Sequence, residues 1–263
     1  MAYFNGTFFS QSLKRPVHFT AVLCNDNAWI DPANKYLKGE TKNVYLLHGY
    51  SGCDTDWPLN APLQEFANKY NVNFFMPNIE NSFYLDQAAT GFKYAEYAGK
   101  EFVEYTRKTF NLSTKRENTY IGGLSMGGFG AIHTGLLYNN TFGGIIALSS
   151  ALIINELHTF KPGMDNGMAN YEYYNLIFGD LNKVKETDKN PEVLLKNLVD
   201  KGQPIPKIYI ACGTEDFLYQ PNVEFKTFLE KLNVPFTYNE GPGIHDFNFW
   251  RAYLPKGLET LIG

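Results

Sequence analysis

The chain has 263 residues, of which 44% are hydrophobic and 19% are charged. This balance is typical of a packed core and argues against disorder. With 23 basic and 27 acidic residues the net charge is −4, which excludes a strongly basic nucleic-acid-binding protein.

No apolar run approaches the roughly 18 residues that a transmembrane helix needs. Residues 1–7 lack the basic and apolar regions of a signal peptide. The three cysteines, Cys24, Cys53 and Cys212, are far apart and form no CxxC pair, which is typical of free thiols in a reducing compartment. We therefore expect a cytoplasmic protein with no membrane segment, no metal site and no nucleic-acid partner.

Strand-like and helix-like segments alternate along the chain. In chain order they are strands 3–10, 17–24, 43–47 and 72–76, helix 92–110, strand 119–122, helix 127–138, strand 144–148, helix 191–200, strand 207–211, helix 222–232, strand 236–239 and helix 246–262. Helix 92–110 repeats small and apolar residues on one face, as a helix that packs on a sheet does. The alternation predicts an α/β fold with a mostly parallel central sheet and helices on both faces.

Residues 152–205 interrupt this alternation and are predicted to be an insertion in a single domain of residues 1–263. The segment holds a tyrosine cluster near Tyr174 and a helix start at Asn190 and Pro191, which suit the N-cap and the first helical position. It is either a lid over a site or a long structural crossover.

The segment from Gly123 to Gly127 fits the pattern G-x-S-x-G between a predicted strand and a predicted helix. In such a turn the backbone at the serine is strained, and the glycines on either side avoid steric clashes. The turn lifts the hydroxyl above the sheet at a helix N-terminus, where the dipole favours negative charge. Ser125 is therefore predicted to be a nucleophile; the alternative is a glycine-rich turn without chemistry.

A serine hydroxyl is a weak nucleophile and needs a base. His245 follows the last predicted strand, at the edge where a doubly wound sheet gathers its loops. Asp216 follows strand 207–211, and the order Ser125, Asp216, His245 is that of α/β-hydrolases. Glu215 is the competing acid, and Asp246 is expected to be a charge at a helix N-terminus.

Acyl transfer also needs two backbone N–H groups aimed at the developing oxyanion. One is expected from Met126, the residue after the nucleophile. The other is expected from Tyr50, in the glycine-rich loop after strand 43–47, with Ser51 as the neighbouring alternative. The side chain of His48 is expected to support this loop.

Four motifs together resemble the esterase D group of α/β-hydrolases, and most closely the bacterial tributyrin-esterase-like carboxylesterases. They are residues 46–49 (LLHG), 123–128 (GLSMGG), 212–219 (CGTEDFLY) and 243–246 (GIHD). The resemblance implies the α/β-hydrolase fold, hydrolysis of acyl esters and no cofactor.

The expected function is a serine carboxylesterase that acts on short-chain acyl esters. Alternatives are a feruloyl or acetyl-carbohydrate esterase, an S-formylglutathione-hydrolase-like thioesterase, an acyltransferase and a silent binding module. The expected partner is a small ester, and homo-oligomerisation is open. Candidate pocket residues are Trp57, Phe217, Tyr219 and Trp250.

Overall fold

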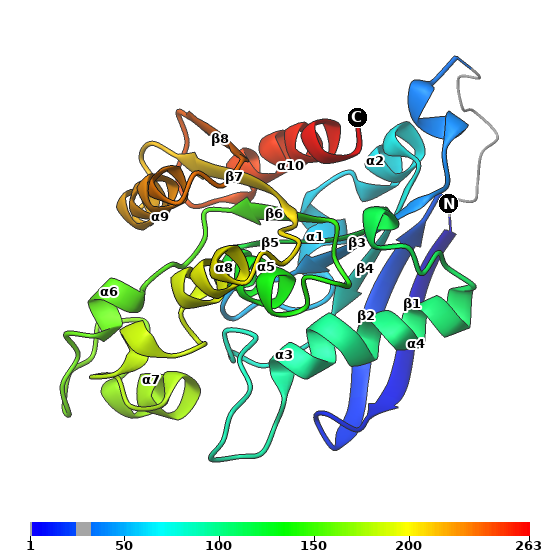
Figure 1. Ribbon diagram of the computed structural model, residues 1–263. Helices are drawn as coiled ribbons and strands as arrows, with labels where there is room; N and C mark the ends of the chain where they lie inside the picture. Colours follow the sequence, from blue (N-terminus) through cyan, green and yellow to red (C-terminus); the bar gives the residue numbers. More distant parts are fainter. Residues whose placement is uncertain (1, 25–32) are drawn as a thin grey trace.

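The computed structural model describes residues 2–24 and 33–263. In this part of the chain, eight strands form one sheet in the order β1-β2-β4-β3-β5-β6-β7-β8 (Figure 1). The strands are β1 (Ala2–Ser10), β2 (Arg15–Leu23), β3 (Lys42–Leu47), β4 (Val72–Pro77), β5 (Thr119–Leu124), β6 (Gly144–Leu148), β7 (Lys207–Gly213) and β8 (Phe236–Gly241). The hairpin β1–β2 is antiparallel and β2 pairs antiparallel with β4, whereas β4 through β8 pair in parallel.

Helices cover both faces of the sheet, as the alternating pattern predicts (Figure 1). The α-helices are α1 (Asp56–Asn60), α2 (Leu63–Tyr70), α3 (Tyr94–Glu96), α4 (Phe102–Phe110), α5 (Met126–Leu137), α6 (Ile154–Leu157), α7 (Tyr171–Phe178), α8 (Pro191–Asp200), α9 (Tyr219–Lys231) and α10 (Phe247–Ile262). Short non-α helical segments are η1 (Lys35–Lys38), η2 (Tyr97–Glu101), η3 (Arg116–Asn118) and η4 (Val184–Glu186). None of the described helices is both long enough and apolar enough to cross a membrane.

The hydrophobic core lies in two clusters, one on each face of the sheet. One cluster combines sheet side chains with those of α4, α5, α8 and α9, and the other with those of α1, α2 and α10. The central strands β4, β5 and β6 are buried along their whole length. Apolar strands buried on both faces are characteristic of a parallel sheet between helices, so the predicted α/β architecture is confirmed.

The helix expected at residues 92–110 forms with a change of pitch in its middle. It consists of α3, the π-helical segment η2 and α4. The predicted apolar face is confirmed, because Ala95, Ala98, Phe102 and Thr106 are buried. The side chain of Glu101, where the π-helical segment ends, accepts hydrogen bonds from the turn between β1 and β2, at 2.6 Å from Gln11 N and 3.1 Å from Ser12 N. The π-helical segment thus ends where the helix anchors the N-terminal hairpin.

The insertion predicted at 152–205 has two parts in the structure. Its second half is a crossover: α8 packs on α5, and Asn190 caps it through a 3.0 Å bond from Glu192 N. Its first half, with α6 and α7, lies at one end of the sheet (Figure 1). Side chains from this half line the cavity described below.

Candidate active site

Ser125 lies in a tight turn between β5 and α5. Its backbone has φ 55° and ψ −120°, a region that residues with a side chain rarely adopt. A Cβ on Gly123 would collide with the Gly127 carbonyl, and one on Gly127 would collide with carbonyl oxygens at the end of β3. The glycines of the motif are therefore required by close backbone contacts.

The neighbouring strand fixes the turn in place. Ser125 N donates to Leu148 O at 2.9 Å, and Ala151 N donates to Ser125 O at 3.0 Å. These bonds connect the turn to the loop that follows β6, on both sides of the serine backbone. The serine is thereby held at the C-terminal edge of the parallel strands.

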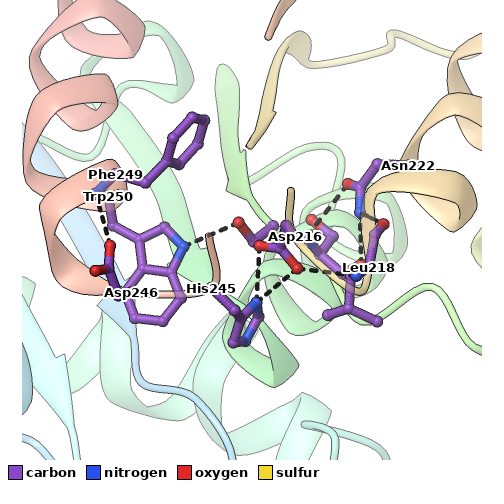
Figure 2. A network of polar contacts seen from close by, with 9 residues as sticks. Asp216, Leu218, Asn222, His245, Asp246, Phe249 and Trp250 are labelled. Carbon is purple, nitrogen blue, oxygen red and sulfur yellow. Dashed lines mark hydrogen bonds and ion pairs between the residues drawn. The ribbon is translucent and has the colours of Figure 1, made fainter. Parts of the chain in front are cut away.

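His245 and Asp216 come together from the loops that follow β8 and β7. The imidazole Nδ1 lies 3.0 Å from Asp216 Oδ1 and 2.9 Å from Oδ2 (Figure 2). This contact leaves Nε2 as the nitrogen that can exchange a proton with a hydroxyl. The Ser125 hydroxyl forms no hydrogen bond with His245 in the part of the chain described, and such catalytic contacts often tighten only with substrate.

The Asp216 carboxylate is held in its ionised form by several donors. Its side chain is fully buried, and burial alone would raise its pKa. Hydrogen bonding with His245, with the Leu218 N–H at 2.8 Å and with Ser149 outweighs burial, so the pKa is lowered. A carboxylate that stays charged can orient the imidazole and stabilise its protonated form.

Aromatic side chains flank the imidazole of His245. Trp250 lies perpendicular to it, with ring centroids 4.9 Å apart, and Phe217 is tilted against it at 4.5 Å. Trp250 Nε1 also donates to Ser149 Oγ at 3.0 Å, and Ser149 hydrogen-bonds to Asp216. Trp250 therefore packs on the histidine and binds a residue that supports the aspartate.

The two competing acids have other partners. Glu215 is exposed and accepts from the N–H of Gly243 and from the hydroxyl of Thr214. Asp246 caps α10 by accepting from Phe249 N at 3.1 Å, which confirms its predicted place at a helix N-terminus. The hydrogen bonds of Glu215 and Asp246 therefore do not involve the imidazole of His245.

The glycine-rich loop after β3 lies against the serine turn. A Cβ built on Gly49 would lie 3.4 Å from Ser125 Cβ. The N–H groups of Tyr50 and Met126 donate no hydrogen bond within the described part of the chain. The Ser51 N–H donates to Asn81 Oδ1 at 2.7 Å, so that of the two donors predicted in this loop Tyr50 is the one without a bond in the described part of the chain.

Asn81 was not predicted, and it connects this loop to the insertion. Its side chain holds Ser51, which has φ 62°, and its carbonyl accepts from Tyr173 Oη at 2.7 Å. Tyr50 Oη in turn contacts the Met168 carbonyl at 3.5 Å. No local sequence pattern marks Asn81, because its partners lie about 30 and 92 positions away.

The surroundings of three other histidines differ from those of His245. His48 is buried, with Nδ1 2.8 Å from Gly49 O and Nε2 3.3 Å from Ile79 N, so it supports the loop as expected. Burial lowers the pKa of His48, and it lowers that of His133 to about 4. His133 packs within α5 against Phe129, and His18 is exposed on β2.

A cavity of about 280 Å³ includes Ser125 in its lining. The lining residues come from the serine turn, the loops after β3 and β7, and the insertion: Tyr50, Phe83, Ser125, Met126, Ala151, Ile153, Glu156, Asn166, Met168, Tyr174, Phe217, Leu218 and Pro221. Of the four predicted pocket residues, Phe217 lies in this lining. Trp57, Tyr219 and Trp250 do not.

Each of those three has another role. Trp57 is fully buried, and its Nε1 donates to Leu47 O at 3.1 Å. Tyr219 begins α9, and its hydroxyl donates to Glu240 at 2.9 Å. Trp250 packs behind His245, as described. The sequence placed these aromatic residues near the right loops but could not show which way their side chains point.

Within residues 2–24 and 33–263, no group of three His, Cys, Asp or Glu side chains could hold a metal ion.

Comparison with known proteins identifies the family. Residues 10–261 match the model of the Esterase family, described as "Putative esterase". An acetyl esterase of Caldicellulosiruptor saccharolyticus is 42% identical over 99% of this chain and 98% of its own length. The chain therefore belongs to this esterase family and is a carboxylic ester hydrolase.

Solved structures of the same fold agree with this assignment. FphF, a fluorophosphonate-binding serine hydrolase of Staphylococcus aureus, is 29% identical with a TM-score of 0.85, over 100% of this chain and 98% of that one. FrmB, an S-formylglutathione hydrolase of the same organism, is 30% identical with a TM-score of 0.83, over 100% and 99%. These neighbours are α/β-hydrolases, and they support a serine esterase.

Asp216→Asn is expected to lower kcat/KM by about a thousandfold or more, because the imidazole loses the acceptor that fixes its tautomer. Glu215→Gln is expected to cost less than about tenfold, because Glu215 binds the Gly243 N–H and not the imidazole. Ester hydrolysis by the two folded variants, measured side by side, checks the ranking. The opposite ranking would make Glu215 the acid.

Asn81→Ala is expected to lower kcat about tenfold with little change in KM, because Ser51 loses its acceptor and the Tyr50 N–H is less well placed. Affinity for a trifluoromethyl ketone, which mimics the oxyanion, should fall in parallel. The control is Asn60→Ala, which removes an amide from the exposed end of α1. Equal losses in both variants would contradict a role for Asn81 in positioning.

Proposed function

We propose that the protein is a serine carboxylesterase that uses Ser125, Asp216 and His245 as a catalytic triad. One observation carries this proposal: Nδ1 of His245 lies within 3.0 Å of both oxygens of a buried carboxylate. The loop that carries Asp216 shares a cavity with Ser125, because its Phe217 lines the cavity and packs on His245.

In the proposed reaction, His245 Nε2 takes the proton of Ser125, and Ser125 Oγ attacks the ester carbonyl. The N–H groups of Tyr50 and Met126 bind the resulting oxyanion. The tetrahedral intermediate then expels the alcohol, which receives the proton from His245, and an acyl-serine remains. Water, deprotonated by His245, attacks the acyl-serine and releases the acid and free Ser125.

Three observations support short acyl esters as the proposed substrates. The cavity of about 280 Å³ lies just below the usual range of volumes for small-molecule sites, which begins at about 300 Å³. Most of its lining side chains are apolar, as an acyl chain requires. The acetyl esterase that is 42% identical over nearly the whole chain supports acetyl and other short acyl groups.

The runner-up is a thioesterase of the S-formylglutathione type. The 30% identity to FrmB over the whole chain favours it. The same triad and oxyanion donors would serve a thioester, because the attack is on the same kind of carbonyl carbon. The nature of the leaving group therefore has to be measured.

Two finer proposals accompany this function. The first places the chain with the tributyrin-esterase-like carboxylesterases, on the four motifs quoted above. The second is a cytoplasmic location, supported by Cys24, Cys53 and Cys212, which are all free thiols.

Ser125→Ala is expected to abolish nearly all turnover in a folded protein, because the acyl-enzyme can no longer form. The assay is a series of p-nitrophenyl esters from acetate to decanoate, with a methyl hydroxycinnamate and an S-acyl glutathione beside it. We expect Ser125-dependent activity that peaks at short chains. Retained activity in the variant would reject the nucleophile, and preference for the hydroxycinnamate or the thioester would reject the proposed substrate class.

A further inference from the structure

Among the described residues that line the cavity over Ser125, Glu156 is the one carboxylate, and none is Lys, Arg or His. It lies on α6, in the first half of the insertion. Its Oε1 accepts from Asn166 Nδ2 at 2.9 Å, and the same nitrogen lies 3.2 Å from Tyr174 Oη. The carboxylate is thus bound by Asn166, a lining residue that also contacts Tyr174.

Glu156 takes part in no ion pair within the part of the chain that the structure describes. The charge of Glu156 also acts on Tyr174, another residue of the cavity lining. Burial raises the pKa of the Tyr174 hydroxyl, and hydrogen bonding with Asn166 opposes this rise. The charges of Glu156 and Asp165 raise the pKa further. Glu156 therefore contributes a negative charge to the lining of the cavity.

We propose that Glu156 is a specificity-determining residue, which makes the enzyme select neutral or cationic esters and reject those that carry a carboxylate near the reacting bond. The proposal rests on the function proposed above and narrows its substrate class. A like charge brought next to Glu156 is repelled in the ground state and in the transition state, so the effect falls on kcat/KM. A glutathione thioester carries two carboxylates, so this site disfavours it relative to an uncharged acyl ester.

Two matched pairs of substrates test the proposal on either side of the reacting bond. On the acyl side, p-nitrophenyl pentanoate is compared with mono-p-nitrophenyl glutarate, which carries a carboxylate at the chain end. On the alcohol side, 4-acetoxybenzamide is compared with 4-acetoxybenzoate. Within each pair the reacting group is the same, and the principal difference is charge.

Glu156→Gln keeps an oxygen that can accept from Asn166 and removes the charge. We expect it to raise kcat/KM for the anionic ester relative to its neutral partner by about fivefold in at least one pair, and we expect the gain to shrink in high salt. The control is Glu172→Gln, which changes the net charge equally from an exposed position on α7 outside the cavity lining.

The proposal would be overturned if, for both pairs, the ratio of kcat/KM for the neutral ester to kcat/KM for the anionic ester were the same in the wild-type enzyme and in Glu156→Gln. An equal shift in Glu172→Gln would also overturn it, because the effect would then come from overall charge. If the wild-type enzyme hydrolyses none of the four esters, the proposed esterase function fails, and the specificity proposal fails with it. Activity on neutral esters without a Glu156 effect leaves the esterase function standing and rejects this proposal alone.

Discussion

The strained backbone at Ser125 is the constraint on which the rest of the site depends. A residue at φ 55° and ψ −120° is stable only where its surroundings hold it, at a cost of about 1–3 kcal/mol. Here the turn is held by backbone bonds to β6 and by glycines that let the ends of β3 and β5 meet α5 without clashes. The same packing brings the loop of Tyr50 beside the serine, so the nucleophile and both proposed oxyanion donors depend on one close contact.

The parallel sheet gathers the remaining parts at one edge. Five loops at this edge supply the residues of the site. The loops after β3, β5, β6, β7 and β8 carry, in that order, Tyr50, Ser125, Ser149, Asp216 and His245. Side chains of the insertion line the cavity at this edge, and among them Glu156 and Asn166 add charge and hydrogen bonding. The proposed catalytic residues therefore lie on loops at the edge of the sheet, whereas the choice of substrate is expected to depend on the insertion.

Much of this arrangement was predictable from sequence, and the parts that were not have physical reasons. The expected strands and helices formed, and helix 191–200 begins at the predicted cap of Asn190. Helix α2 was overlooked although Leu63, Phe66, Ala67 and Tyr70 have helical spacing, because eight residues give a weak periodic signal. The pairing of Asp216 with His245 followed from chain order, but Trp57, Tyr219 and Trp250 were placed in the pocket wrongly, because side-chain direction depends on tertiary packing. Asn81 and Glu156 had no sequence signal, since their roles come from contacts between distant segments.

The central claim is that the hydroxyl of Ser125 becomes acylated. The most direct measurement treats wild-type and Ser125→Ala protein with a fluorophosphonate, a reagent that traps activated serines, and maps the modified peptide by mass spectrometry. The account predicts one adduct, on the peptide that contains Ser125, and none in the folded variant. An adduct on another residue, or none on a folded wild-type protein, would contradict it.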